Sequence, residues 1–338
     1  MRLLLAAALA FGAGACATPA IQGDPAVSVV AVAETEPVGT AAEDAADDPA
    51  IWRNPADPGA SLIVATDKKA GLYVYGLDGK ARSFTPAGLL NNVDLVEHPD
   101  HGAIVVASDR TDPANAKIRV YRLDTAAGRL EPIGVVDGGA GEGYGICARL
   151  DGPDVRVASV LKDGTIFEIG FAPAGDGLAS AAQTFGTRRV PTQAEGCVYD
   201  PRDGTLYVGE ENGGVWRFPT EGAGELVAPV DNRMLVVDVE GLALVPEGVD
   251  GGLLIASSQG DNAFAVFRLP GMEPVGRFRI AAGAFGATEE TDGIAAQAGD
   301  FGPAFPGGLF VAQDGRNEPA AQNFKLVGWA DILEALQR

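Results

Sequence analysis

Short stretches in which apolar and polar residues alternate recur along most of this chain. KIRVYRL and VRVASV are two of them, and clusters of Gly, Asp and Asn separate one stretch from the next. Alternation with a period of two residues is typical of β-strands, because successive side chains of a strand point to opposite faces. The pattern predicts an all-β protein with one short helix near the C-terminus, over residues 328–338.

The predicted strands fall into six similar units. Each unit opens with a polar residue before an apolar strand, then continues with a second strand that ends in a polar cluster and with a third strand. Successive openings are 46, 50, 51, 45 and 52 residues apart, at Asp48, Asp94, Tyr144, Glu195, Glu240 and Asp292. Repeats of this length, built from short strands, are typical of a β-propeller. We therefore predict a six-bladed β-propeller over residues 41–338.

The six opening residues should meet in one ring, because the first strand of each propeller blade lines the central channel. Five of the six are acidic. Carboxylates that converge on a channel cannot all stay ionised without a counter-charge. Oxygen ligands without clusters of His or Cys favour calcium over zinc or copper. The ring indicates a single structural calcium ion in the simplest interpretation, and we expect a working site beside it.

Polar residues at the ends of the second strands should lie at the same end of the channel. Lys68, Arg110 and Lys162 hold equivalent places in three consecutive units. Cations beside carboxylates can bind phosphate through both a metal and the side chains; scattered surface cations are the alternative. The Tyr144 phenol could bind an anion or merely fill the channel. The whole set comprises Asp67, Lys68, Lys69, Asp109, Arg110, Lys162, Asp163, Glu210, Glu211, Gln259, Asp261, Gln313 and Asp314.

Composition narrows the choice of function. The 46 Gly and 22 Pro residues among 338 exclude a helix bundle, and 46 Asp and Glu against 25 Lys and Arg give a net charge of −21. A field of that sign repels nucleic acid, so we expect no nucleic-acid partner, and it suits a protein that collects calcium. No G-x-S-x-G motif, His-based triad or Walker loop supports nucleophilic serine or P-loop chemistry. We expect a monomer.

The N-terminus has the pattern of an export signal. Residues 1–16 combine one basic residue, an apolar run and small residues before Cys16. Ala13–Cys16 also resembles a bacterial lipobox, which would make Cys16 a lipid anchor; ordinary cleavage between Ala13 and Ala20 is the alternative. Residues 17–40 are interpreted as a tether. The protein is then exported, and is periplasmic, anchored to the outer membrane or extracellular.

Two cysteines remain after the signal, and we predict a disulfide between them. Cys147 lies three residues after Tyr144, and Cys197 two residues after Glu195. The odd and even offsets place the two thiols on opposite faces of their sheets. They then either meet across the interface of blades 3 and 4 or point away toward blades 2 and 5. Two free buried cysteines are the alternative, and export favours the bridge.

From about residue 38 to the C-terminus the chain resembles the β-propeller phytases. The resemblance rests, in order, on AADDPAIW, TDKKAGLYVY, LLNNVDLV, SDR, YG, AEG, GEEN, VEGLAL, ASSQGDNAFAVF, TDGI, FPGGLFVAQDG and QNFKLV. It implies a phosphomonoesterase that uses several calcium ions to hydrolyse phytate, myo-inositol hexakisphosphate, usually as a 3-phytase. The substrate would arrive as its calcium complex.

The resemblance also implies roles for individual residues. Those expected to bind phosphate and assist catalysis are Lys68, Arg110, Tyr144 and Lys162, with Lys69 also at the phosphates; those expected to hold calcium are Asp48, Glu195, Glu211, Asp238, Glu240, Asp292 and Asp314. Asp163 stands where the family more often has Glu, and Asn212 where Asp is expected. A six-bladed calcium-dependent lactonase and a non-catalytic binding propeller are the competing interpretations.

Overall fold

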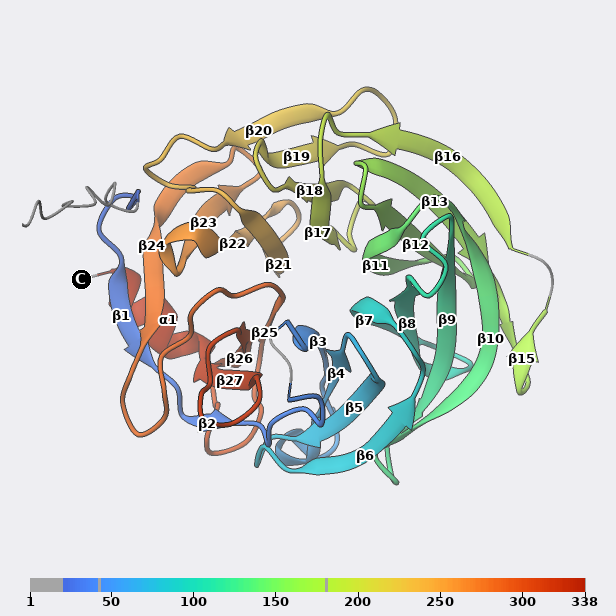
Figure 1. The fold of residues 1–338 in the computed structure, drawn as a ribbon, viewed down its shortest axis with the longest axis horizontal. Helices are drawn as coiled ribbons and strands as arrows, with labels where there is room; N and C mark the ends of the chain where they lie inside the picture. Colours follow the sequence, from blue (N-terminus) through green and yellow to red (C-terminus); the bar gives the residue numbers. More distant parts are fainter. Residues whose placement is uncertain (1–20, 42–43, 180–181, 338) are drawn as a thin grey trace, which may run out of the picture.

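Six β-sheets surround a central channel and form a β-propeller, as predicted (Figure 1). This computed structural model describes residues 21–41, 44–179 and 182–337. The predicted signal over residues 1–16 and its Cys16 lie outside the described residues. Within the part that the structure describes, no helix is long and apolar enough to cross a membrane.

Each blade is a meander of antiparallel strands whose first strand is innermost. Blade 1 consists of β3 (Ala46–Trp52), β4 (Leu62–Asp67), β5 (Gly71–Gly76) and β6 (Ala81–Pro86). Blade 2 consists of β7 (Leu90–His98), β8 (Gly102–Asp109), β9 (Asn115–Asp124) and β10 (Arg129–Ala140). Blade 3 consists of β11 (Gly143–Asp151), β12 (Asp154–Leu161), β13 (Thr165–Phe171) and β16 (Gln183–Arg189), with β14 (Pro173–Ala174) and β15 (Gly177–Leu178) as a side hairpin.

The second half of the ring repeats this order. Blade 4 consists of β17 (Ala194–Tyr199), β18 (Leu206–Glu210), β19 (Gly214–Phe218) and β20 (Glu225–Pro229). Blade 5 consists of β21 (Val239–Glu247), β22 (Gly251–Ser258), β23 (Ala263–Leu269) and β24 (Glu273–Ala281). Blade 6 consists of β25 (Ile294–Ala298), β26 (Gly308–Asp314) and β27 (Asn323–Gly328), and the predicted terminal helix follows as α1 (Trp329–Leu336).

The N-terminal segment is part of the propeller. β1 (Val27–Val30) pairs in parallel with β24, and β2 (Ala33–Glu34) pairs antiparallel with β27, so this segment supplies the outermost strands of blades 5 and 6. In the described part of residues 17–40, the structure therefore has two paired strands where the sequence indicated a tether. The absence of clear periodicity misled the prediction, because two short edge strands need little alternation of their own.

The core consists of six apolar clusters, one at each interface between neighbouring blades. Strand β8 shows why the alternating pattern produces this arrangement. Val105 packs toward blade 1, whereas its neighbours Ile104 and Val106 pack toward blade 3. An inner strand buried on both faces joins two interfaces at once, which fixes each blade against the next.

The predicted disulfide is present between Cys147 on β11 and Cys197 on β17, with Cα atoms 5.7 Å apart. Both residues belong to the apolar cluster between blades 3 and 4. Of the two arrangements that the odd and even offsets allowed, the structure has the one in which the cysteines meet across the interface of blades 3 and 4.

Candidate active site

A one-residue shift in strand pairing occurs at the same place in blades 1–5. Pairing between the first two strands of these blades skips two residues, for example between Ala46 and Pro49 or between Ala194 and Cys197. Such β-bulges redirect side chains. The first skipped residue of each blade, together with Asp292 just before β25, forms what we call the inner ring: Asp47, Asn91, Tyr144, Glu195, Glu240 and Asp292.

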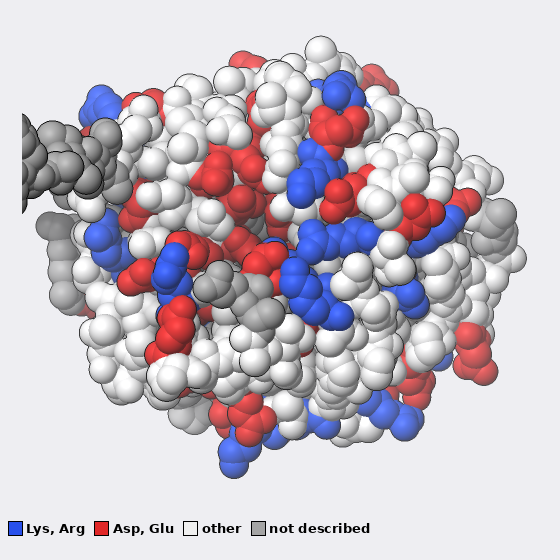
Figure 2. All heavy atoms as spheres, viewed as in Figure 1, with Lys and Arg blue, Asp and Glu red and all other residues white. Residues whose placement is uncertain are grey.

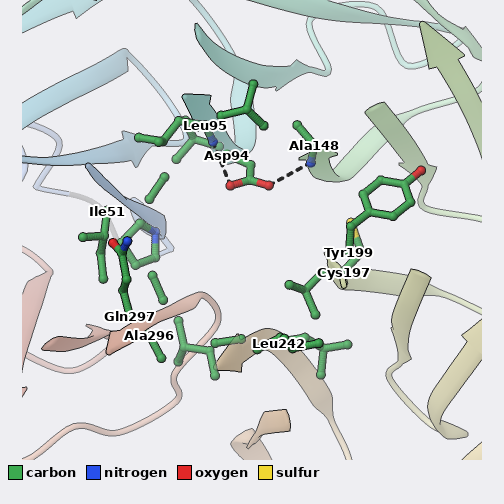
Figure 3. A pocket seen from close by; sticks show the side chains of 18 of the residues that line it. Ile51, Asp94, Leu95, Ala148, Cys197, Tyr199, Leu242, Ala296 and Gln297 are labelled. Carbon is green, nitrogen blue, oxygen red and sulfur yellow. Dashed lines mark hydrogen bonds between the residues drawn. The ribbon is translucent and has the colours of Figure 1, made fainter. Parts of the chain in front are cut away.

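The predicted ring was wrong at two positions, those given to Asp48 and Asp94. Asp48 is the second residue of its bulge, and its Oδ2 accepts a hydrogen bond from Val93 N at 3.1 Å. Asp94 lies three residues beyond Asn91, farther along the channel, where its carboxylate accepts hydrogen bonds from Leu95 N at 2.7 Å and Ala148 N at 2.8 Å (Figure 3). The inner-ring residues of these blades are instead Asp47 and Asn91.

A glycine follows the inner-ring residue in blades 3–6 because neighbouring blades touch there. A Cβ atom on Gly145 would lie 1.8 Å from the Glu195 carbonyl oxygen, and one on Gly196 would lie 2.2 Å from that of Glu240. In blades 1 and 2, Asp48 and Asn92 take the corresponding place. The glycine that marks the ring position is therefore missing from these two units, which explains the error of register.

A second ring surrounds the first. In blades 1–5 the residue that directly follows the second strand makes the same backbone hydrogen bond. Its N–H donates to the carbonyl oxygen of the residue two places before the inner-ring residue, as Lys68 N does to Ala45 O in blade 1. We call these the outer ring: Lys68, Arg110, Lys162, Glu211 and Gln259. The predicted equivalence of the three cations is thus confirmed by one repeated hydrogen bond, and an acid and an amide take the same place in the next two blades.

Three buried glutamates face one another at the junction of blades 4 and 5. Glu195, Glu211 and Glu240 each place one carboxylate oxygen so that the three atoms lie within 4.8 Å of one another. Burial raises the pKa of all three carboxyl groups, and the neighbouring carboxylates add to the rise at Glu195 and Glu240. Asp238 also raises the pKa of Glu211. We call the three glutamates the acidic trio.

The trio has the properties of a site for a hard cation. Glu240 Oε2 is buried and has no hydrogen-bond partner among the described residues. Asp47 Oδ2, in the same inner ring, is likewise buried and without a partner in the described part of the chain. Buried charged oxygens cost free energy unless they are paired or coordinate a metal. An all-oxygen set of this kind fits calcium.

Lys68 is the internal counter-ion of the inner ring. Its Nζ lies 2.6 Å from Asp44 Oδ1, 2.9 Å from Asp47 Oδ1 and 3.1 Å from Asp292 Oδ2, and its side chain is 5% exposed. Burial alone would lower the pKa of Lys68, but the surrounding carboxylates raise it well above its usual value. Burial also raises the pKa of Asp292 to about 7, although Lys68 opposes the rise.

Tyr144 lies close to two further predicted cations, Arg110 and Lys162. Lys162 Nζ is 5.0 Å from the centroid of the phenol ring, and Arg110 Cζ is 5.9 Å from it. Lys69, by contrast, is paired with Asp44 at 3.2 Å. We call Arg110, Tyr144 and Lys162 the basic cradle. Figure 2 shows acidic side chains gathered over blades 4 and 5 and basic ones on the side of blades 2 and 3.

Several acids at the ends of the second strands bind within their own blades. Asp314 Oδ2 lies 3.0 Å from Lys325 Nζ, and its Oδ1 accepts a hydrogen bond from Arg316 N at 3.2 Å. Glu210 accepts hydrogen bonds from Thr192 and from Trp216 Nε1. The structure therefore places Asp314 opposite a buried lysine of blade 6, whereas Glu211, one residue after Glu210, joins the acidic trio.

Neutral amides also belong to the site, and two of them, Asn91 and Gln193, escaped a search based on charge. Asn91 Nδ2 donates a hydrogen bond to Glu195 Oε1 at 2.8 Å, and Gln259 Nε2 donates one to Asp292 Oδ1 at 2.6 Å. Gln193 Nε2 donates to both Glu211 Oε1 and Tyr144 Oη. Gln259 was in the set of polar residues predicted from the sequence, whereas Asn91 lies in a bulge that no glycine marks.

Beyond the inner ring, the channel widens into a cavity of about 690 Å³. Its walls combine polar residues with apolar ones such as Ile51, Leu242 and Ala296, and Asp94 points into it (Figure 3). Burial raises the pKa of Asp94 to about 6.

Comparisons with known proteins agree with this geometry. A family model described as Phytase matches residues 2–338. A curated 3-phytase of Bacillus subtilis (strain 168) is 35% identical over 328 residues, which cover 91% of this chain and 85% of that protein. A chain in a solved structure of the mitotic checkpoint complex superposes with a TM-score of 0.51 at 12% identity, over 98% of this chain and 86% of that chain, a likeness of fold alone.

Proposed function

The chain belongs to the phytase family and hydrolyses phytate, and we propose that it does so as a calcium-dependent 3-phytase. The observation that carries the calcium proposal is the acidic trio, three buried carboxylates of which Glu240 keeps one oxygen without a partner among the described residues. The basic cradle beside the trio supports the assignment of a phosphate substrate. Cations and cation-binding acids are thus adjacent, as binding of a metal-bridged phosphate requires.

Metal binding and phosphate binding are assigned to two neighbouring groups of residues at the channel. Glu195, Glu211 and Glu240 would hold calcium, with Asp47, Asp238 and Asp292 close by. When bound, calcium supplies positive charge that offsets the phosphoryl oxygens and polarises the attacking water. Arg110 and Lys162 bind phosphate oxygens through charge-assisted hydrogen bonds, and both cations lie near the Tyr144 ring. Lys68 forms ion pairs with Asp47 and Asp292 and stabilises the ionised form of Asp292.

The net charge of −21 bears on how the substrate arrives. A bare polyanion is repelled by a surface of the same sign. Phytate therefore enters as its calcium complex, in which the bound cations offset part of that repulsion. A lactonase would have no use for the basic cradle, which is why this interpretation is less well supported.

Calcium dependence is tested by phosphate release from phytate in chelator and after calcium is restored. We expect chelation to abolish release and added calcium to recover it. Calcium should also raise the Tm, because an ion that binds only the folded state shifts the unfolding equilibrium. Full phosphate release in chelator together with an unchanged Tm would contradict the proposal. Lactone hydrolysis without phosphate release would favour a lactonase. Binding of phytate without phosphate release would favour a non-catalytic binding propeller.

Export is part of the same proposal. Residues 1–16 have the composition of a signal, and the Cys147–Cys197 disulfide is of the kind that forms in oxidising compartments. The protein is then periplasmic, anchored to the outer membrane through a lipid on Cys16, or extracellular, and acts as a monomer. The mass of the mature N-terminal peptide distinguishes a lipidated Cys16 from cleavage between Ala13 and Ala20.

A further inference from the structure

One uncharged side chain connects the acidic trio to the basic cradle. Gln193 directly precedes β17 and lies two residues before Glu195. Its Nε2 donates hydrogen bonds to Glu211 Oε1 and, at 3.4 Å, to Tyr144 Oη. Its backbone carbonyl also accepts the N–H of Glu211 at 3.0 Å. Gln193 therefore holds Glu211 at both backbone and side chain while touching a residue of blade 3.

The side-chain contact goes beyond what the fold requires. The backbone hydrogen bond from the outer ring recurs in blades 1–5, where the acceptor residues are Ala45, Leu89, Glu142, Gln193 and Asp238. Ala45 and Leu89 have no polar side-chain atom, and the Glu142 side chain lies 4.0 Å from Arg110, the outer-ring cation of the preceding blade. Blade 4 has an acid in the outer ring and a donor at the acceptor position. The side chain is thus matched to the charge of Glu211.

The neighbouring pair Thr192 and Glu210 provides a contrast on the same loop. Thr192 donates to Glu210 Oε1 through its backbone N at 2.9 Å and its Oγ1 at 2.6 Å, and Trp216 donates to Glu210 Oε2 at 2.8 Å. Both oxygens of Glu210 are therefore engaged within blade 4. On Glu211, Gln193 engages Oε1, which leaves Oε2 to be offered to a ligand.

From this geometry we infer that Gln193 is a positioning residue for calcium and phosphate together. By engaging one oxygen of Glu211 it restrains the carboxylate that meets Glu195 and Glu240, and by contacting Tyr144 it connects the cradle to the trio. This inference rests on the proposed calcium-dependent function. Fastening blades 3 and 4 is a lesser role for Gln193, because the Cys147–Cys197 bridge already joins their inner strands.

The test compares calcium binding by three variants and the parent, using calorimetry with calcium alone. Gln193→Met keeps the approximate size of the side chain and removes its N–H donors, and Gln193→Ala also removes its bulk. Both should weaken calcium binding about tenfold, since loss of a group that orients a metal ligand typically costs 10–100-fold in affinity. Thr192→Ala is the matched control on the same loop, and its calcium affinity should equal that of the parent.

Kinetics and stability separate positioning from a purely structural role. For Gln193→Met, excess calcium should recover most of kcat while KM for phytate stays raised, because Tyr144 has lost its partner. The inference would be overturned if Gln193→Met bound calcium within twofold of the parent, or if Thr192→Ala lost as much calcium affinity. It would also be overturned if the only change in Gln193→Met were a lower Tm in chelator. If the parent itself neither binds nor requires calcium, the proposed function fails instead.

Discussion

At the residue scale, three of the four phosphate-binding cations predicted from sequence occupy the same place in their blades but have different surroundings. Lys68 is enclosed by three carboxylates and is 5% exposed, whereas Arg110 and Lys162 flank the Tyr144 ring. A cation that also compensates buried acids has a role in stability that the other two lack. The three positions should therefore respond differently to truncation.

Arg110→Ala and Lys162→Ala should each lower kcat/KM for phytate and leave the Tm unchanged. Loss of one charge-assisted contact to phosphate costs roughly 1.5–3 kcal/mol, on the order of a ten- to hundredfold loss of rate. Lys117→Ala is the control, because Lys117 is a half-exposed residue of β9 paired with the exposed Asp137, and such surface pairs contribute little to stability. An equal loss of kcat/KM at Lys117 would mean that the cradle does not bind the substrate.

Lys68→Ala should reduce both activity and stability. Removal of Lys68 leaves Asp47 and Asp292 without their counter-ion, and an uncompensated buried charge is strongly destabilising. We expect a lower Tm in chelator, with part of the loss recovered by calcium, as measured by thermal unfolding of variant and parent. An unchanged Tm in chelator would show that the carboxylates take up protons at no cost and that Lys68 serves binding alone.

The sequence allowed most charged members of the site to be found but not their register. Glu195, Glu240 and Asp292 were correctly placed because a glycine follows each of them. Asp47 and Asn91 were missed because no glycine marks their bulges, and a β-bulge leaves no trace in a pattern of alternation. Gln193 was missed because its role depends on a contact between blades, which no local pattern encodes.

At the scale of elements, one unit is used six times and its chemistry is changed at two positions. The bulge and the hydrogen bond from the outer ring recur in blades 1–5, while the outer-ring side chains change from cations in blades 1–3 to an acid in blade 4 and an amide in blade 5. The fold was predictable because its period of 45–52 residues survives these substitutions. The two N-terminal strands were not, because they pair with blades 5 and 6, whose strands lie near the other end of the chain.

The disulfide between β11 and β17 should contribute substantially to stability. It closes a loop with a sequence separation of 50 residues, which in the chain-entropy model is worth about 4 kcal/mol. Replacing both cysteines by alanine should lower the Tm, and reducing agent should lower the Tm of the parent but not that of the double variant. Two alkylatable thiols in an oxidised, exported sample would contradict the bridge.

At the scale of the whole molecule, the site concentrates negative charge where the blades converge. Six clusters of apolar residues hold the blades together, and the converging carboxylates oppose that packing whenever they are ionised. The protein carries a net charge of −21, so the surface does nothing to relieve this repulsion. The stability of the calcium-free protein should therefore depend on the protonation of a few buried acids.

Without calcium, the Tm should fall as the pH rises. Burial raises the pKa of Asp292 from 3.8 to about 7, so between these values the folded protein binds a proton that the unfolded chain has lost. Stability falls with rising pH wherever the native state binds more protons than the unfolded chain. The stability that protonated Asp292 contributes is therefore complete below a pH of 3.8 and is lost as the pH passes about 7. Thermal unfolding in chelator, from about pH 5 to about pH 8, measures the fall.

Calcium should reverse this dependence, because it binds the ionised carboxylates and is therefore held more tightly as the pH rises. In excess calcium the Tm at about pH 8 should equal or exceed that at about pH 5. Asp292→Asn, which cannot ionise at this position, should flatten the pH dependence measured in chelator. A chelated parent whose Tm rises through this range would show that the inner-ring acids are ionised in the folded state without a metal, and that Lys68 alone is sufficient to compensate them.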